Sequence, residues 1–255
     1  MDLKKNIKRT GLAMADLLLP RVCVVCGERL LLDENHICLH CLADIPLTHF
    51  WERDHNPMAD RFNAVIQEWV TETDGQDIAH LHERYAHAAA LFYFSSDAPY
   101  RHILYALKYQ GRTDLGRYFG KMLGVRLASA EAFGDVDCVV PVPLHWFRRW
   151  RRGYNQAEII AGEVALALGT EVRTDILKRV RRTRTQTKMN VEEKGINVAG
   201  AFRAYRKGAS PKHILIIDDL FTTGSTVCAC FTALRAVFPP SVRISVATLG
   251  FVGGA

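Results

Sequence analysis

The most regular hydrophobic pattern in the chain lies in residues 214–217, where four apolar side chains follow one another without interruption. A short unbroken apolar run is typical of a strand that is covered on both faces of a parallel sheet. The run leads directly into Asp218 and Asp219, then into a loop of small polar residues, and then into residues 227–237, which have the composition of a covered helix. The pattern predicts a strand, an acidic pair, a loop and a helix, in that order.

Strands and helices alternate through the rest of the C-terminal half. Short apolar segments near residues 136, 172, 202, 214 and 244 predict strands, and residues 114–132 and 157–168 predict helices between them, the first capped by Asp114. This alternation indicates an α/β fold built on a parallel sheet flanked by helices.

The region before this alternation is less regular. Residues 88–94 have strand character, and residues 100–111 predict a helix that ends at a glycine. Lys108 in its last turn is either a partner of the helix dipole, which we favour, or a group that points at a phosphate. Residues 46–83 are rich in His, Asp and Glu, with spacings that fit no familiar metal site, and they show little periodicity. We therefore expect three parts: residues 1–48, a solvated linker or hood at 49–95, and the α/β domain at 96–255.

The composition is that of a folded protein. A chain of 255 residues, 49% of them hydrophobic, is long enough for one large domain and a small appendage. The apolar run at residues 12–19 is interrupted by Asp16 and is far too short to span a bilayer. Basic residues precede it, as in a signal peptide, but no small-residue cleavage site follows. We expect a short N-terminal amphipathic helix and a cytoplasmic protein without a membrane span.

Four of the seven cysteines form two Cys-x-x-Cys pairs, Cys23 with Cys26 and Cys38 with Cys41, separated by eleven residues. This spacing matches a tetrahedral four-cysteine zinc ribbon, in which the ion replaces a core too small to fold alone. A redox-active pair is the alternative. Because four sulfurs complete the coordination shell, we expect a structural zinc and no catalytic metal position, with the neighbouring histidines as bystanders.

The segment after the 214–217 run has a chemical use. A loop that enters a helix leaves backbone N–H groups unpaired, and the helix dipole adds partial positive charge at the same place. A phosphate monoester fits this cradle, and the hydroxyls of the loop add donors, while the two carboxylates can accept hydrogen bonds from sugar hydroxyls. An ordinary turn capped by one hydroxyl is the alternative, but it gives no reason for the acidic pair. The loop residues are Thr222, Thr223, Gly224, Ser225 and Thr226.

A second polar segment, residues 145–156, is expected as a loop at the carboxyl end of another strand. It interleaves four arginines with aromatic residues. Guanidinium groups bind phosphate in a bidentate manner, and aromatic rings stack on nucleic-acid bases. The candidate contacts to single-stranded DNA are Trp146, Arg148, Arg149, Trp150 and Arg151.

Charge concentrates in the same region. The whole chain has a net charge of +6, whereas residues 145–190 carry eleven Lys or Arg against four acidic residues. A concentrated basic region implies a polyanionic partner, either a pyrophosphate or a nucleic acid, with an acidic protein as the alternative. No Gly-x-Gly-x-x-Gly segment opens a strand–helix unit and no Gly-Lys-Ser/Thr loop occurs, so dinucleotide binding of the Rossmann type and P-loop ATP hydrolysis are not expected.

The strand, acidic pair and loop at 214–226 resemble the phosphoribosyl pyrophosphate (PRPP) motif of the type I phosphoribosyltransferases. Further segments resemble the ComF (GntX-like) family of bacterial proteins linked to DNA uptake and use. These segments are the paired cysteines and residues 107–111, 140–143, 152–156, 183–186 and 197–202. Lys194 departs from the pattern, because the resemblance leads us to expect an arginine there; lysine keeps the charge but loses the bidentate fork.

The resemblance implies a type I phosphoribosyltransferase-like fold with an N-terminal zinc ribbon. It also implies that Asp218 and Asp219 bind ribose, that residues 222–226 hold the 5′-phosphate, and that Mg²⁺ accompanies PRPP. Residues 179–194 are then the loop that closes over the site. The pyrophosphate is expected to face Arg152, Gly153, Asn155 and Gln156.

Two functions follow from these features. The first is phosphoribosyl transfer from PRPP, or a related sugar phosphate, to an acceptor, as displacement of pyrophosphate at the anomeric carbon; no covalent nucleophile is needed. The second is a non-catalytic protein that handles single-stranded DNA with the same fold, together with a protein partner from the DNA-uptake machinery. The sequence leaves both open.

Overall fold

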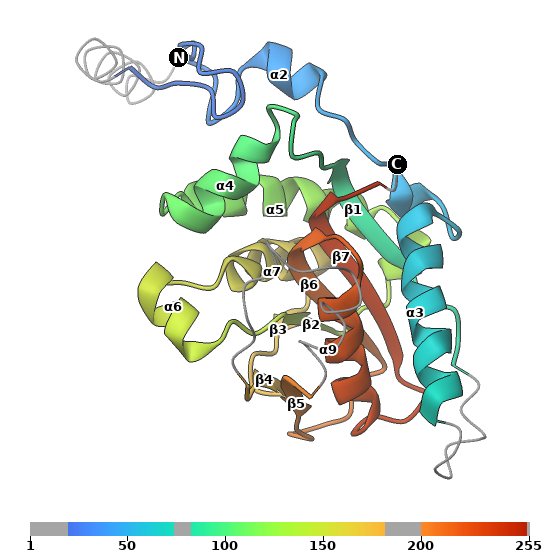
Figure 1. Cartoon of the computed structure of the whole chain (residues 1–255). Helices are drawn as coiled ribbons and strands as arrows, with labels where there is room; N and C mark the ends of the chain where they lie inside the picture. The colour runs from blue at the N-terminus through green and yellow to red at the C-terminus, as the bar shows by residue number, and fades with distance from the viewer. Residues whose placement is uncertain (1–19, 74–82, 182–199, 254–255) are drawn as a thin grey trace.

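A computed structural model describes residues 20–73, 83–181 and 200–253 of the chain (Figure 1). Its centre is a five-stranded sheet, and every pair of neighbouring strands in it is parallel. The strand order is β1 (Ala88–Tyr93), β7 (Arg243–Phe251), β6 (His213–Phe221), β2 (Cys138–Pro141) and β3 (Glu171–Val172). The predicted α/β fold with a parallel sheet flanked by helices is thus confirmed.

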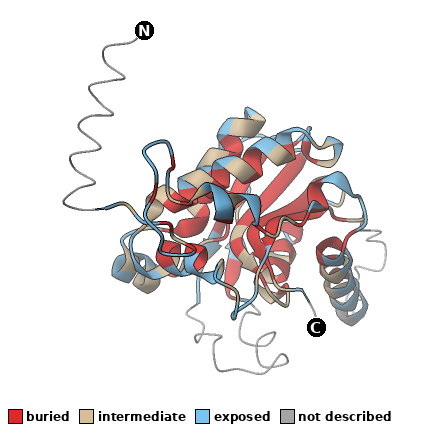
Figure 2. Ribbon diagram, turned by 90° about the horizontal axis from the view of Figure 1, so that it is seen from above, coloured by how far each residue is buried: buried red, intermediate tan, exposed pale blue. Residues whose placement is uncertain are grey.

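Helices cover both faces of the sheet (Figure 1). On one face, α5 (Thr113–Ala128) and α7 (Gln156–Leu168) pack against the strands, preceded by α4 (Arg101–Tyr109). On the other face lie α3 (Pro57–Thr73) and α9 (Ser225–Arg235), which contact each other. Strands β6 and β7 are therefore buried on both sides, which explains their nearly continuous apolar sequences (Figure 2).

The membership of the sheet differs from the prediction at two strands. The strand near residue 202 is β5 (Phe202–Ala204), which pairs antiparallel with β4 (Leu177–Arg179) outside the main sheet. Its residues alternate between buried and exposed, so it has one apolar face and does not suit the interior of a parallel sheet. The edge position is taken by β1, from the segment assigned to the linker or hood, whose first five residues are all buried.

Helix α3 is the element that the sequence analysis missed, because residues 57–73 were expected to be an irregular linker. The buried residues Met58, Phe62 and Ile66 recur every fourth position, so one face of the helix is apolar. Asn56 caps the helix by accepting hydrogen bonds from the backbone N–H groups of Met58 and Ala59. The helical period was present in the sequence, but the polar and charged residues between these positions obscured it.

Short elements complete the described chain. Helix α2 (Leu39–Ala43) belongs to the cysteine-bearing N-terminal part, and α6 (Trp146–Arg152) follows β2. The 3₁₀ turns η1 (Phe50–Glu52) and η2 (Glu131–Phe133) flank larger elements. In the part of the chain that the structure describes, no helix combines the length and the apolar character needed to cross a bilayer. The amphipathic helix expected at residues 12–19 lies outside the described residues.

Helices α5 and α7 approach closely because three glycines of α5, at positions 116, 120 and 124, face α7. A β-carbon added at Gly124 would lie 2.8 Å from Ala167 Cβ and 3.0 Å from Val164 Cα. These distances are shorter than van der Waals contact, and Val164 Cα is a backbone atom that cannot rotate away. The two helices can therefore keep their separation only without a side chain at this position.

We expect Gly124→Val to lower the free energy of unfolding by about 2–4 kcal/mol, because overpacking forces the helices apart. The matched control is Gly162→Ala in α7, where an added β-carbon meets nothing within 4 Å. Alanine has the better helix propensity, so this control is expected to raise stability by up to about 1 kcal/mol. Urea denaturation of both variants measures the two effects, and equal stability of Gly124→Val and wild type would contradict the close packing.

Candidate functional site

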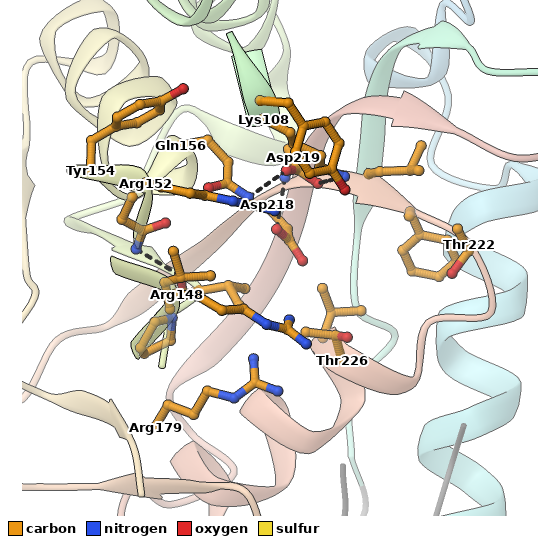
Figure 3. A pocket seen from close by; sticks show the side chains of 18 of the residues that line it. Lys108, Arg148, Arg152, Tyr154, Gln156, Arg179, Asp218, Asp219, Thr222 and Thr226 are labelled. Atoms are coloured by element: carbon orange, nitrogen blue, oxygen red, sulfur yellow. Dashed lines mark hydrogen bonds and ion pairs between the residues drawn. The ribbon is translucent and has the colours of Figure 1, made fainter. Parts of the chain in front are cut away.

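A cavity of about 640 Å³ opens at the carboxyl ends of β2 and β6 (Figure 3). The chain leaves β2 towards α7 on one face of the sheet and leaves β6 towards α9 on the other face. Neighbouring strands whose connections diverge in this way leave a crevice between them, the usual ligand position in open α/β sheets. Residues at the ends of both strands and in the segments after them line the cavity, including Pro143, Gln156, Asp218 and Thr226.

The acidic pair lies inside the last part of β6, because this strand continues to Phe221. Consecutive residues of a strand point to opposite faces of the sheet, so Asp218 and Asp219 are not equivalent. Both line the cavity, but Asp219 is only 4% exposed, whereas Asp218 is partly exposed. The two carboxylates therefore have different surroundings, although the sequence assigned them one role.

Asp219 is held by two side chains from the helices on its face of the sheet. Gln156 Nε2 donates to Asp219 Oδ2 at 2.8 Å, and Lys108 Nζ lies 2.9 Å from Asp219 Oδ1 (Figure 3). Both carboxylate oxygens are thus engaged. For Lys108 the sequence analysis favoured the helix dipole over a phosphate contact, whereas the side chain lines the cavity. Its position in the last turn of α4, before a helix-ending glycine at the cavity rim, was the available signal.

Asp218 faces the open cavity. Its Oδ1 accepts a hydrogen bond from the backbone N–H of Asp219 at 2.8 Å, and among the described residues nothing bonds to its second oxygen. Burial raises the pKa of Asp218 to about 7, and the nearby charge of Asp219 adds to this increase. A cation or a hydroxyl donor that approached the free oxygen would stabilise the ionised form. Carboxylate oxygens are also preferred ligands of Mg²⁺, so Asp218 is the residue of this site that could hold such an ion.

The segment 222–226 leads into α9, as the sequence predicted, but the helix begins at Ser225 rather than at residue 227, so the last two residues of the segment are helical. Gly224 has a φ of +84°, and a β-carbon there would lie 2.9 Å from Phe221 Cζ, so only glycine fits without strain. Thr222, Gly224 and Thr226 line the cavity. Thr223 and Ser225 do not; their hydroxyls lie 2.8 Å apart and bond to each other. The cradle for an anion is thus formed by part of the loop and the exposed end of α9.

Helix α3 anchors this loop from outside the cavity. Arg61 Nη1 donates to the backbone carbonyls of Thr222 at 2.9 Å and Val252 at 3.0 Å. The Arg61 guanidinium also lies over the ring of Phe251, 5.0 Å from its centroid. The segment expected to be a linker therefore contributes the residue that fixes the start of the candidate phosphate loop.

Residues 146–152, which were expected to form part of a loop, form the helix α6 with no buried residue. Arg148, Arg151 and Arg152 line the cavity, whereas Arg149 forms an ion pair of 2.7 Å with Glu158 of α7. The helix begins after His145, whose Nδ1 accepts the backbone N–H of Phe147. A run of arginines and aromatic residues has no turn-forming residue before Gly153, which allows this helix.

The remaining residues of the predicted pyrophosphate segment have mainly structural contacts. Gly153 ends α6 with a φ of +80° and does not line the cavity. Asn155, 3% exposed, caps α7 through its side-chain oxygen and donates to the Val142 carbonyl at 3.0 Å. Gln156 is engaged with Asp219. Arg152 is the charged residue among these four. It lines the cavity, and its guanidinium lies over the Tyr109 ring.

The cavity as a whole is cationic. It combines two carboxylates with the side chains of Lys108, Arg148, Arg151, Arg152 and Arg179. Arg179 ends β4 and lies over the ring of Phe202, so the small antiparallel pair supplies a charge to the site. The sequence placed this residue in a closing loop at 179–194; most of that loop, including Lys194, lies outside the described residues.

The four paired cysteines meet at the N-terminal end of the described chain. Their sulfur atoms all lie within 4.8 Å of one another, and Cys26 Sγ is 3.8 Å from Cys38 Sγ. Tetrahedral coordination with Zn–S bonds of about 2.3 Å places sulfurs roughly 3.8 Å apart, so this geometry fits a metal such as zinc. The backbone N–H groups of Val25 and Cys41 point at Cys23 and Cys38 Sγ, each at 3.4 Å, as expected around thiolates.

The cysteine-bearing segment docks on α4 and α5. His36 Nδ1 lies 3.0 Å from Asp114 Oδ2, and its ring contacts the edge of Tyr118. Tyr100 donates to the carbonyl of Cys41 at 3.1 Å. Asp114 was predicted to cap α5, but it lies within the first turn of this helix. Its carboxylate also accepts hydrogen bonds from Nε and Nη2 of Arg112. The histidine beside the cysteines thus serves as a contact between the two parts.

A Ser–His–Asp arrangement occurs at the other end of the sheet. His213 Nδ1 lies 2.7 Å from Asp135 Oδ1, and His213 Nε2 lies 2.8 Å from Ser245 Oγ. These distances match a nucleophilic triad, but Ser245 is only 2% exposed. His213 and Ser245 also lie near the starts of β6 and β7, at the opposite end of these strands from the cavity. A substrate cannot reach this serine, so the network ties the strand ends together.

Relatives with known names support the resemblance read from the motifs. Competence protein F of Haemophilus influenzae is 29% identical over 147 residues, which cover 56% of this chain and 64% of that protein. The DNA utilization protein YhgH of Salmonella typhi is 31% identical over 128 residues, covering 49% and 56%, and that of Escherichia coli K12 is 29% identical over 132 residues, covering 51% and 58%. The chain thus matches less than two thirds of each relative.

Comparisons with family models and with solved structures add little to this resemblance. No family model matches the chain. The crystal structure of orotate phosphoribosyltransferase from Aeropyrum pernix aligns with 62% of this chain and 66% of its own, at 13% identity and a TM-score of 0.30. With homologues named competence protein F and DNA utilization protein YhgH, the resemblance of this chain to the ComF family is confirmed.

Proposed function

We propose that the cavity binds PRPP together with Mg²⁺, and that the protein is a phosphoribosyltransferase-like protein. One observation carries the proposal: a partly exposed carboxylate at the end of β6 and the open N-terminus of α9 face the same cation-lined cavity. The first suits sugar hydroxyls and a metal ion, the second suits a terminal phosphate, and the cations suit a pyrophosphate. PRPP carries all three groups on one ribose.

In this proposal, different residues of the chain bind different groups of PRPP. The backbone of Thr222, Gly224 and Thr226, together with the dipole of α9, holds the 5′-phosphate, and Asp218 orients the ribose hydroxyls. Lys108 and Gln156 fix Asp219, which keeps the end of β6 rigid. Arg148, Arg151 and Arg152 stabilise the negative charge that develops on pyrophosphate as it leaves. Mg²⁺, when bound, would add charge neutralisation, and Asp218 is the carboxylate that would hold it.

The biological setting is proposed from the relatives. Competence protein F and DNA utilization protein YhgH are named for DNA uptake and use, and this chain shares about half of its length with them. We propose a role in the same process, with PRPP or a related sugar phosphate as the ligand, a structural zinc at the four cysteines, and a partner in the DNA-uptake machinery. The cytoplasmic location expected from the sequence stays a prediction.

The proposal is tested by thermal unfolding with PRPP in the presence of Mg²⁺. At a PRPP concentration 100 times its Kd, binding stabilises the folded state by about 2.7 kcal/mol, which corresponds to a Tm increase of about 5–10 °C. Removing Mg²⁺ with a chelator that leaves zinc bound should reduce the shift, and ribose 5-phosphate should give a smaller one. No shift at millimolar PRPP would contradict the proposal. Pyrophosphate release with a panel of acceptors then tests turnover.

A second candidate function, binding of single-stranded DNA, is favoured by the surface of α6. Trp146 and Trp150 are 71% and 78% exposed, four positions apart on one face of the helix. Large aromatic side chains with this exposure are uncommon unless they contact a partner. Arg148, Arg149 and Arg151 lie between or beside them, so stacking surfaces and positive charge are interleaved as single-strand binding requires.

We expect Trp150→Ala to weaken binding of a single-stranded oligonucleotide by roughly 5- to 150-fold, since a stacked base is worth about 1–3 kcal/mol. Fluorescence anisotropy with a labelled oligonucleotide at several salt concentrations measures this, and the affinity itself should fall steeply with salt. Leu166→Ala is the control, because Leu166 is 78% exposed and lies ten residues along α7 from Gln156, about 15 Å away. Equal affinities of Trp150→Ala and wild type for the oligonucleotide would exclude α6 as the surface on which its bases stack.

A further inference from the structure

Helix α3 is bound to the candidate phosphate loop through a single side chain. Arg61 Nη1 donates to the backbone carbonyl of Thr222 at 2.9 Å and to that of Val252 at 3.0 Å. The first carbonyl belongs to a residue that lines the cavity, and the second follows the end of β7. One guanidinium therefore joins α3, the start of the loop and the end of a neighbouring strand.

The hydrogen bond to Thr222 fixes the direction of one peptide unit. In a trans peptide the C=O and the following N–H point in opposite directions, so the N–H of Thr223 points away from α3. Arg61 itself does not line the cavity, which means that the carbonyl it binds is turned out of the cavity. A carbonyl that faced a bound anion would repel it, whereas backbone N–H groups attract it.

The loop rests on two buried aromatic rings. Phe221 lies directly against Gly224, where an added β-carbon would meet its Cζ at 2.9 Å. The ring centroids of Phe221 and Phe251 lie 5.9 Å apart, and both residues are 1% exposed. The Arg61 guanidinium lies over Phe251 at 5.0 Å from the ring centroid, an attractive cation–π contact. Arginine, rings and loop thus form one close-packed unit.

The charge of Arg61 has no acidic partner in the part of the chain that the structure describes. The acceptors of its hydrogen bonds are neutral carbonyls, and its remaining contact is an aromatic ring. Lys108, by contrast, is paired with Asp219. Half-buried charges are usually paired, so Arg61 leaves net positive charge behind the loop. An anion held by the loop would balance this charge.

The next residue of α3 contacts the helix that follows the loop. Phe62 is fully buried, and its ring packs edge-on against Phe231 of α9, with 5.7 Å between the centroids. Trp69, further along α3, contacts the same ring at 6.3 Å. Helix α3 therefore supports both parts of the anion cradle, the loop through Arg61 and α9 through Phe62 (Figure 1).

We propose that Arg61 is a positioning residue for the anion at the N-terminus of α9, and that α3 is therefore part of the binding site. This inference rests on the proposed function, in which that anion is the 5′-phosphate of a sugar phosphate. Arg61 acts on it without contact and in two ways. It holds the Thr222 carbonyl out of the cavity, and it places positive charge behind the loop.

Calorimetric titration of the intact protein, with its metal bound, tests this role with ribose 5-phosphate, a probe that carries only the phosphate of the loop. We expect Arg61→Met to weaken its binding by roughly 5- to 30-fold, the range for loss of one half-buried charge near an anion. The affinity should also depend less on salt, which a purely structural role would not produce. Binding of inorganic pyrophosphate with Mg²⁺, which we place at the arginines of α6, should change less than about twofold, because Arg61 does not contact them.

Two further variants separate the charge from the fold. Arg61→Lys keeps the charge and one donor, so it should recover most of the lost affinity. Arg61→Gln keeps a neutral donor for one carbonyl and should still bind ribose 5-phosphate weakly, which preserves the test if Arg61→Met does not fold. The matched control is Lys121→Met, because Lys121 is exposed on α5, on the opposite face of the sheet. It loses the same charge and should bind like the wild type.

The outcomes distinguish this role from the proposed function. If Arg61→Met and Arg61→Gln bind ribose 5-phosphate as tightly as the wild type does, Arg61 has no such role, while the site itself stands. A parallel loss of affinity for ribose 5-phosphate and pyrophosphate would also overturn it, because it would indicate general loosening of the cavity. If the wild type binds neither ligand, the proposed function fails as well.

Discussion

The Asp218→Asn variant is expected to lose the Mg²⁺-dependent stabilisation by PRPP and, at the same time, to unfold at a higher denaturant concentration than the wild type at pH 8. The first effect follows because the free carboxylate oxygen faces the cavity, and an amide cannot neutralise a metal ion there. The second follows because burial and the charge of Asp219 raise the pKa of Asp218 to about 7.

The sign of the stability effect depends on pH. In the unfolded chain an aspartate titrates near pH 3.9, so between about pH 4 and pH 7 the folded wild type holds a proton that the unfolded state has lost. The contribution of this group to stability therefore falls as pH rises through that window and is lowest above pH 7. Asparagine has no charge to bury, so the advantage of the variant should be near zero at pH 4 and reach about 1–3 kcal/mol at pH 8.

Asp219→Asn is the matched control, since it removes the neighbouring carboxylate and should change stability in the opposite direction. Lys108 and Gln156 both donate to Asp219, and an asparagine leaves the partly buried ammonium of Lys108 without its counter-charge. We expect a loss of about 1–3 kcal/mol at neutral pH. Urea denaturation at pH 4, 6 and 8 measures both variants; the same sign of change in the two at pH 8 would contradict the distinct roles of the two acids.

Loss of the metal from the four-cysteine site is expected to unfold the N-terminal part of the described chain while the α/β domain persists. This part has little regular secondary structure of its own: two isolated β-bridges and the five-residue helix α2, joined by turns. Structural zinc contributes about 10–16 kcal/mol of apparent binding free energy in zinc-finger peptides at neutral pH, far more than such a small segment gains from its own packing.

Cys26→Ser tests this most cleanly, because Cys26 is exposed and its replacement leaves no cavity in the core. Native mass spectrometry should show one zinc ion per wild-type chain and none in the variant, and amide exchange should increase in residues 20–43. Cys138→Ala is the control, since this buried thiol of β2 lies outside the cluster and its loss should leave the zinc content unchanged. Protection of residues 20–43 in metal-free Cys26→Ser would show that the segment folds without metal.

Several elements could be predicted because their signals are local. The apolar run of β6, the acids after it and the small loop before α9 follow one another in the chain, so their order alone predicted a ligand site at a strand end. The spacing of the four cysteines likewise predicted their convergence, which the structure shows. Short-range sequence patterns fix such features because few intervening dihedral angles separate their members.

Other features depended on where a strand ends. The apolar run stops at Ile217, which suggested that the strand ends at the two acids and that they share a role. Pairing with β7 extends β6 to Phe221, with Asp218 opposite Thr248 and Leu220 opposite Gly250. The partner strand, rather than local composition, therefore decided that the two carboxylates point to opposite faces of the sheet.

The sequence by itself determined that this protein has a parallel α/β sheet, a cluster of four cysteines and an acidic strand end followed by a polar loop, because adjacent or regularly spaced residues specify each of them. Only the tertiary structure decided that Lys108 and Gln156 meet at Asp219, and that Arg61 anchors the loop at 222–226. These contacts join residues far apart in the chain. Their geometry is set by how helices pack on the sheet, which no short segment encodes.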